Sequence, residues 1–220
     1  MIWVFGDSFF EADPSNWCSW PATENLAHRA TSLDWLYATY SRMESRIQPG
    51  DHVIIGLTTQ ARTWFLERDI EATQIFHGYV PHASEQEQLA MKLYTEHLWN
   101  NTARMINLEN FLGRVDHYMS THQAHCLIIN SFPDTEEIIN LLNLSERYGH
   151  IDFAKGTLMR ASLEEWENAP DTMQDLRINH LSDINHDILR NKVDLWIDSK
   201  KPVDLTEGLA KEILKGSAKI

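Results

Sequence analysis

The stretch Ile2-Trp-Val-Phe-Gly-Asp-Ser8 is a short apolar run that leads directly into a polar turn. Four apolar residues in succession, β-branched and aromatic ones among them, are typical of a strand buried in a parallel sheet. Gly-Asp-Ser is typical of a tight turn. Because ligands of α/β proteins bind beyond the carboxyl ends of the strands, this stretch predicts a buried strand that places Ser8 at a binding edge.

Two further apolar runs, His52–Leu57 and His125–Asn130, have a similar length and character. Four stretches with helical periodicity or helix-capping residues lie between or after the strands: Ser32–Arg46, Ser84–Tyr118, Asp134–Leu144 and Ile184–Ile197. Asp134 is expected to cap the third of these helices. Strands that alternate with helices predict an α/β fold with a mostly parallel sheet and helices on both faces.

Polar side chains directly follow each of the three predicted strands. Ser8 follows the first strand, Thr58 to Gln60 follow the second, and Asn130-Ser131 end the third. Because the carboxyl ends of parallel strands meet at one edge of a sheet, we expect these residues to lie along a common edge. This expectation depends on topology alone.

Composition and charge bound the kind of protein and its partners. The 220 residues suit a single domain spanning 1–220. The 19 basic and 32 acidic residues give a formal net charge of −13. A field of this sign repels nucleic acids and anionic membrane surfaces, so neither is expected as a main partner. The two cysteines, Cys18 and Cys126, match neither a disulfide framework nor a zinc knuckle.

The sequence also contains no recognisable targeting signal or membrane-spanning segment. The amino-terminal residues lack the basic region, long apolar core and small-residue cleavage site of a signal peptide. No stretch approaches the roughly 20 apolar residues that a membrane span requires. These features predict a cytoplasmic protein, and a virion-associated or otherwise delivered protein would have the same features.

The Ser8 turn and the later segment Leu181-Ser-Asp183-Ile-Asn-His186 have the chemistry of a nucleophilic serine site. A catalytic serine needs an exposed hydroxyl, a nearby base and backbone donors for the developing oxyanion. Asp183 and His186, three residues apart at a predicted helix start, can place a carboxylate beside an imidazole. Each feature also has a plain structural explanation: Gly-Asp-Ser is ordinary turn composition, Asp183 suits a helix N-cap, and His186 suits a helix surface.

Gly6-Asp7-Ser8 after the first strand, followed near the C-terminus by Asp183-Ile-Asn-His186, resembles the pattern of the SGNH/GDSL hydrolase family. The resemblance spans nearly the whole chain. It implies a three-layer α/β/α, flavodoxin-like sandwich in which Ser8 is the nucleophile, His186 the general base and acid, and Asp183 its orienting partner. Gly6 and Asp7 would shape the nucleophile turn.

The same resemblance implies a serine esterase that needs no cofactor. Its substrate would be an acyl ester, in the first place an acetyl ester, of a carbohydrate or another small polar molecule. Two alternatives stay open. One is a weakly active or inactive SGNH-like module, for instance a viral one, that binds a partner or serves a structural role. The other is a lipid esterase or thioesterase.

The chain departs from the family in two blocks that supply oxyanion donors. Ala30 stands where the family has a glycine, and Gln60 stands where it has an asparagine. The backbone N–H of Ala30 can still donate, and the Gln60 carboxamide can donate from one methylene farther out. A hydroxyl of Thr58 or Thr59 is the alternative donor. Because losing one oxyanion donor costs about 3 kcal/mol of transition-state stabilisation, these changes predict a weakened enzyme rather than a dead one.

Several other residues have two interpretations. Arg62 suits an anionic substrate group or, as we favour, an ion pair with an acid on this very acidic surface. Trp17 and Trp20 suit the rim of a sugar or acyl site or, preferably, packing of a loop onto the sheet. The closest histidine cluster is His117, His122 and His125, which lacks an HExxH pattern and a carboxylate in register. No metal site is therefore expected.

Overall fold

The computed structural model describes residues 1–11, 17–29, 31–63, 73–74, 84–158, 181 and 183–209. A five-stranded sheet in the order β2-β1-β3-β6-β7 forms its centre, and all neighbouring strands are parallel. Its strands are β1 (Ile2–Phe5), β2 (Thr23–Asn25), β3 (His52–Leu57), β6 (His125–Asn130) and β7 (Ile151–Thr157). Two short strands, β4 (Arg62–Thr63) and β5 (Thr73–Gln74), form a separate antiparallel pair. The main sheet has the flavodoxin-like strand order.

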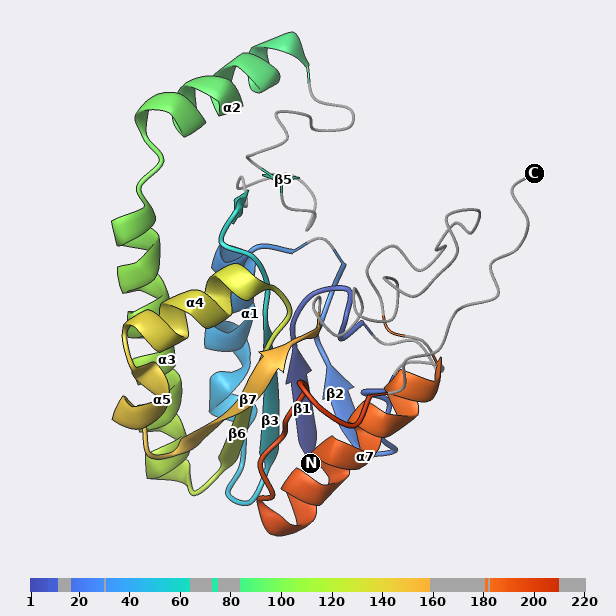
Figure 1. Ribbon diagram of the computed structural model, residues 1–220. Coiled ribbons are helices and arrows are strands. Elements are labelled where there is room, and N and C mark those ends of the chain that lie inside the picture. Colours follow the sequence, from blue (N-terminus) through green and yellow to red (C-terminus); the bar gives the residue numbers. More distant parts are fainter. Residues whose placement is uncertain are drawn as a thin grey trace, which may run out of the picture.

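The described helices are α1 (Leu33–Met43), α2 (Glu85–His97), α3 (Asn101–His122), α4 (Pro133–Leu141), α5 (Leu144–Arg147) and α7 (Asp183–Ser199), with a short 3-10 turn, η1 (Glu44–Arg46), after α1. Side chains of α1, α3, α4 and α5 pack on one face of the sheet, and those of α7 pack on the other (Figure 1). The protein is therefore a three-layer α/β/α sandwich, as the sequence predicts.

The strands are apolar throughout because both of their faces are covered. In β1, Trp3 and Phe5 contact the core beneath α1 and α3, whereas Val4 faces the core beneath α7. In β3, Ile55 and Ile54 divide in the same way, and all of these side chains are essentially fully buried. Successive side chains of a strand point to opposite faces, so a strand between two helix layers needs apolar residues at every position.

Two glycines make room for one aromatic ring on the α7 side of the sheet. A Cβ atom added at Gly56 would lie 2.0 Å from Phe10 Cε2, and one added at Gly6 would lie 2.7 Å from Phe10 Cδ2. Because no real side chain tolerates such contacts, the Phe10 ring can lie across β1 and β3 only if both positions lack a side chain. Gly6 thus shapes the turn before Ser8 by a packing requirement.

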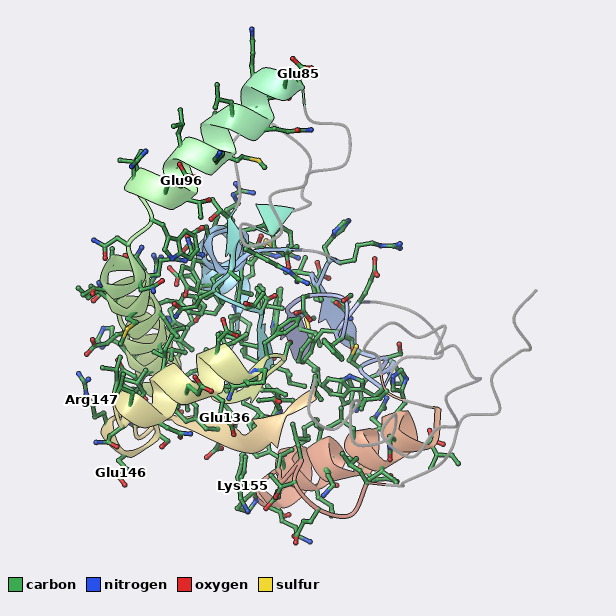
Figure 2. The ribbon with its side chains drawn as sticks, turned by 45° about the horizontal axis from the view of Figure 1, so that its top comes forward. Glu85, Glu96, Glu136, Glu146, Arg147 and Lys155 are labelled. Carbon is green, nitrogen blue, oxygen red and sulfur yellow. The ribbon has the colours of Figure 1, made fainter. Side chains whose placement is uncertain are left out.

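The three strands predicted from the sequence match β1, β3 and β6 in their bounds. The single helix predicted over Ser84–Tyr118 is wrong in its continuity. Residues 98–100 separate α2 from α3, and the Asn100 side chain starts α3 by accepting a hydrogen bond of 3.0 Å from the Ala103 N–H. None of the α2 residues is buried. Helix α2, with Glu85 and Glu96 near its ends, extends away from the sheet (Figures 1 and 2).

Strands β2 and β7 were not predicted from the sequence. Strand β2 is only Thr-Glu-Asn, half-buried at one edge of the sheet. Strand β7 mixes buried residues with the exposed Asp152 and Lys155, and residues 203–205 run beside it through hydrogen bonds to both backbone groups of Lys155. Edge strands have one weakly covered side, so they lack the continuous apolar run that identifies a central strand.

Within the described residues, no helix has the length and apolar character to cross a membrane.

Candidate active site

Ser8 lies at the tip of a tight turn that begins where β1 ends. The Phe10 N–H donates to the Asp7 carbonyl at 2.9 Å, which closes the turn around Ser8 and Phe9. The Asp7 side chain adds a second closure because its Oδ1 accepts the Phe9 N–H at 3.1 Å. An aspartate at the first position of a turn stabilises it in this way. Ser8 is half-buried, so its side chain sits on a rigid support and is still accessible.

The turn lies at the topological switch point of the sheet. Strand β1 has β2 on one side and β3 on the other, and ligands of flavodoxin-like proteins bind at the carboxyl ends of the strands at this point. The predicted convergence of strand ends is confirmed by contacts. The Ser131 hydroxyl donates to Asp7 Oδ1 at 3.1 Å, and the Ser131 N–H donates to the Leu57 carbonyl at 2.9 Å.

A buried polar cluster lies beneath this edge and is organised around Arg62, which is 7% exposed. Arg62 Nη1 donates to the Thr58 hydroxyl at 2.8 Å and lies 3.8 Å from Asp7 Oδ2. The same nitrogen donates to the Thr31 carbonyl over a longer distance of 3.4 Å. The ion pair expected for Arg62 is therefore confirmed, although its acid is the fully buried Asp7 and not a surface carboxylate.

Burial sets the pKa values of this pair. Desolvation raises the pKa of Asp7 above its usual value, while Arg62, the Phe9 N–H and the hydroxyls of Thr58 and Ser131 oppose the rise. Desolvation also lowers the pKa of Arg62, against the attraction of Asp7 and Asp134. In the described part of the chain, several buried atoms of the cluster have no hydrogen-bond partner: Asp7 Oδ2, Gln60 Nε2, Arg62 Nε and Asn130 Oδ1.

The three residues after β3 that could donate to an oxyanion, Thr58, Thr59 and Gln60, differ in the hydrogen bonds that they already make. The Thr59 hydroxyl donates to Asp134 Oδ2 at 2.8 Å, so its proton is already engaged. The Thr58 oxygen accepts from Arg62 beneath the site and is 1% exposed. The Gln60 backbone N–H donates to Asp134 Oδ2 at 2.8 Å, which holds the residue in place while its side-chain amide stays unpaired. Of the three proposed side-chain donors, Gln60 is the one whose donor nitrogen, Nε2, has no partner among the described residues.

Asp134 is the functional neighbour that sequence reasoning placed incorrectly. It was expected to cap the helix that follows β6, but it is the second residue of α4, which begins at Pro133 and has no side-chain cap. Its carboxylate instead accepts from Thr59 and Gln60 and fixes the turn after β3. Acidic residues are favourable in the first turn of any helix, so the sequence carried no signal for this second role.

The predicted triad partners lie on α7, which begins at Asp183. His186 is half-buried in the first turn of this helix, next to the fully buried Asn185. Residues three apart on a helix lie on one face, as an Asp-His pair requires. The side chain of Asp183 and the whole of Ala30 lie outside the described residues, so the triad and the Ala30 donor stay predictions.

Helix α7 is docked onto the segment that follows Ser8. The Trp17 indole N–H donates to the Phe9 carbonyl at 2.9 Å, and Arg190 Nη1 donates to the Trp17 carbonyl at 3.2 Å. Arg190 also lies over the Trp20 ring, 4.1 Å from its centre. Both tryptophans therefore pack the loop onto the sheet and α7, as favoured. Arg190, one helical turn beyond His186, had no distinguishing signal in the sequence.

Two of the three clustered histidines singled out in the sequence are engaged in ring contacts. His122 stacks on Tyr118 with ring centres 3.8 Å apart, and His125 stacks on His52 at 5.3 Å. The described residues contain no group of three or more His, Cys, Asp or Glu side chains that could hold a metal ion. Both cysteines are buried free thiols.

Comparison with known proteins adds no family assignment. None of the models of known protein families matches the chain, and no curated protein matches it. The case for a particular activity therefore depends on the residue pattern and on the geometry described above.

Proposed function

We propose that this protein is a serine esterase that removes an acyl group, in the first place acetyl, from a carbohydrate or another small polar ester. The observation that carries the proposal is the position of Ser8. It occupies the tip of a turn that two hydrogen bonds of Asp7 close, at the switch point of a flavodoxin-like sheet. The acetyl preference and the triad roles come from the resemblance to SGNH/GDSL hydrolases.

In the proposed reaction, Ser8 Oγ attacks the ester carbonyl carbon while His186 accepts the hydroxyl proton. The bond from this carbon to the leaving oxygen then breaks, and His186 passes the proton to the departing alcohol. Water attacks the acyl-enzyme next, His186 takes a proton from the water, and Ser8 recovers a proton when the acid leaves. Asp183 would orient the imidazole throughout.

The oxyanion of each tetrahedral intermediate would be bound by the N–H groups of Ser8 and Ala30 and by the side-chain amide of Gln60. Among the described residues Gln60 Nε2 has no hydrogen-bond partner, which supports its assignment over Thr59, whose hydroxyl already donates to Asp134. Removing a donor of this kind lowers the rate by about 100-fold or more. Gln60→Ala should therefore be slow, whereas Thr59→Val should lose rate only through the weakened turn.

A fluorophosphonate probe tests the nucleophile directly. The native protein and Ser145→Ala, a control at an exposed serine of α5, should be labelled, while Ser8→Ala and His186→Ala should not. Labelling that survives Ser8→Ala contradicts the proposal. A folded native protein that is not labelled at all would favour the binding or structural alternative.

Acyl-chain preference separates esterase classes. Hydrolysis of nitrophenyl acetate, butyrate and decanoate by the native protein and by Ser8→Ala should show a preference for acetate that depends on Ser8. A preference for decanoate would instead indicate a lipid esterase or thioesterase.

A further inference from the structure

We propose that Arg62 is a positioning residue that fastens together the three loop segments carrying the nucleophile and the oxyanion donors, an inference that rests on the proposed esterase function. No such role follows from the resemblance to hydrolases, which provides only the nucleophile, the acid-base pair and the donors. It follows from the contacts of one buried guanidinium.

Arg62 contacts a residue within two positions of each part of the proposed machinery. Asp7 Oδ2, at 3.8 Å, belongs to the residue before the nucleophile Ser8. The Thr31 carbonyl, at 3.4 Å, belongs to the residue after the proposed donor Ala30. The Thr58 hydroxyl, at 2.8 Å, lies two residues before Gln60. A single side chain thus connects the ends of segments that are remote from one another in sequence.

The guanidinium is itself held on its other sides. Its carbon lies 5.1 Å from the centre of the Phe132 ring, in the segment after β6. The Arg62 carbonyl accepts from Arg104 Nη2 of α3 at 2.6 Å, and Arg104 Nη1 lies 3.6 Å from Asp34 of α1. Because both its backbone and its side chain are anchored, Arg62 fixes the position of the Ser8 turn relative to helices α1 and α3.

The chemistry of the position favours arginine and argues against a role in stability alone. A guanidinium stays charged when buried and presents several donors in a rigid plane, whereas a buried lysine has one flexible ammonium group. A buried ion pair is a poor way to stabilise a fold, because well-packed apolar residues often do as well or better. Among the described residues, Arg62 Nε has no hydrogen-bond partner and Asp7 Oδ2 has only the 3.8 Å ion pair, a further cost that stability alone would not retain.

Amide hydrogen exchange tests, without any substrate, whether Arg62 holds the three loop segments in place. Removing Arg62 alone would leave Asp7 buried without its partner, so we compare Asp7→Asn/Arg62→Met with Asp7→Asn, and add Asp7→Asn/Arg62→Lys. The amides of Phe10, Trp35 and Gln60 report on the three segments. We expect the Met double variant to exchange about tenfold faster at all three than Asp7→Asn, with the central amides of β6 unchanged. An equal increase in β6, or an increase in only one segment, overturns the proposal.

Labelling kinetics test the consequence for the site. With the fluorophosphonate probe, the Met double variant should react about 100-fold more slowly than Asp7→Asn at saturating probe, with little change in the concentration for half-saturation. The Lys double variant should recover part of the rate, and Arg114→Met, at an exposed ion pair with Glu44, should match the native protein. Equal rates for Asp7→Asn and the Met double variant overturn the proposal. If the native protein is not labelled, the esterase proposal fails, while the exchange experiment still decides the role of Arg62.

Discussion

Two buried aspartates at opposite edges of the sheet have opposite surroundings. Asp51 precedes β3 and accepts hydrogen bonds from the Trp3 indole at 2.8 Å, the Gln48 N–H at 2.9 Å and the terminal amino group at 2.9 Å. Burial opposes its ionisation, but these donors lower its pKa below the usual value. Asp7 follows β1 and, among the described residues, accepts hydrogen bonds through Oδ1 only, and burial raises its pKa.

This difference is the one expected between a structural carboxylate, Asp51, and a carboxylate of the proposed site, Asp7. Asp51 closes the amino edge of the sheet, since the buried Trp3 indole N–H and the part-buried Gln48 N–H would otherwise be left without an acceptor. Asp7 sits at the carboxyl edge among atoms that lack partners in the described residues, so its burial costs stability. Proteins keep such groups mainly where the site needs them, and the carboxyl edge is where this fold binds ligands.

The largest effect should come from Asp51→Ala. The variant leaves the buried Trp3 indole N–H and the Gln48 N–H without an acceptor, which should lower the free energy of unfolding by about 3 kcal/mol. Urea unfolding measures this change. Asp51→Asn keeps one acceptor oxygen and should lose roughly half as much. A loss below about 1 kcal/mol for the alanine variant would remove the contrast between the two aspartates.

Alanine substitutions at two glycines test how tightly the carboxyl edge and the amino edge of the sheet are packed. Gly56→Ala forces a methyl group into the Phe10 ring and should cost about 2 kcal/mol in the free energy of unfolding. Gly50 lies in the turn before Asp51, with φ +82° and no atom near the added Cβ, so Gly50→Ala should cost only about 1 kcal/mol of backbone strain. If thermal unfolding ranks the two variants in the reverse order, the carboxyl edge is not the tightly packed one.

The amino edge should also weaken in mild acid. Desolvation, Lys200 and His125 lower the pKa of His52 to about 4, whereas in the unfolded chain His52 titrates near its usual value of 6.5. The unfolded state therefore binds more protons between these values, and stability falls as the pH drops from 6.5 to 4. Because His52 is half-exposed, we expect a loss of about 1 kcal/mol. Chemical unfolding at several pH values should show a smaller loss in Lys200→Met, and an equal loss would contradict this origin.

The smallest effect should distinguish the aspartates by the sign of a pH dependence. Asp7 has a raised pKa, so the folded state keeps its proton longer and stability from this group falls as the pH rises above 3.8. Asp51 has a lowered pKa, so its contribution is present above 3.8 and is lost as the pH falls. Relative to the native protein, Asp7→Asn should gain stability with rising pH and Asp51→Asn should lose it. If the stability difference from the native protein changes with pH in the same direction for both variants, the comparison of the two aspartates is refuted.

Local sequence predicted the central strands well because their burial on both faces requires an unbroken apolar run. It predicted β2 and β7 poorly because edge strands have no such requirement, and it ran α2 and α3 together because the break at 98–100 has only a capping asparagine. The common edge of Ser8, Thr58 and Ser131 followed from topology, since parallel strands share a direction. The second role of Asp134 did not, because an acid in a first helical turn looks the same whether or not it receives a neighbouring loop.

By itself, the sequence determined the α/β class, the three central strands and the end of the sheet at which Ser8 lies, because each follows from the alternation or capping of neighbouring residues. Only the tertiary structure decided which polar groups meet at that edge. Arg62 meets Asp7, Thr31 and Thr58 because the strand order brings β1 beside β3 and returns the chain through β4, and no local pattern encodes that proximity. Tertiary structure likewise buried Gln60 Nε2 and Asp7 Oδ2 without a hydrogen-bond partner among the described residues, which no local pattern of the sequence indicates.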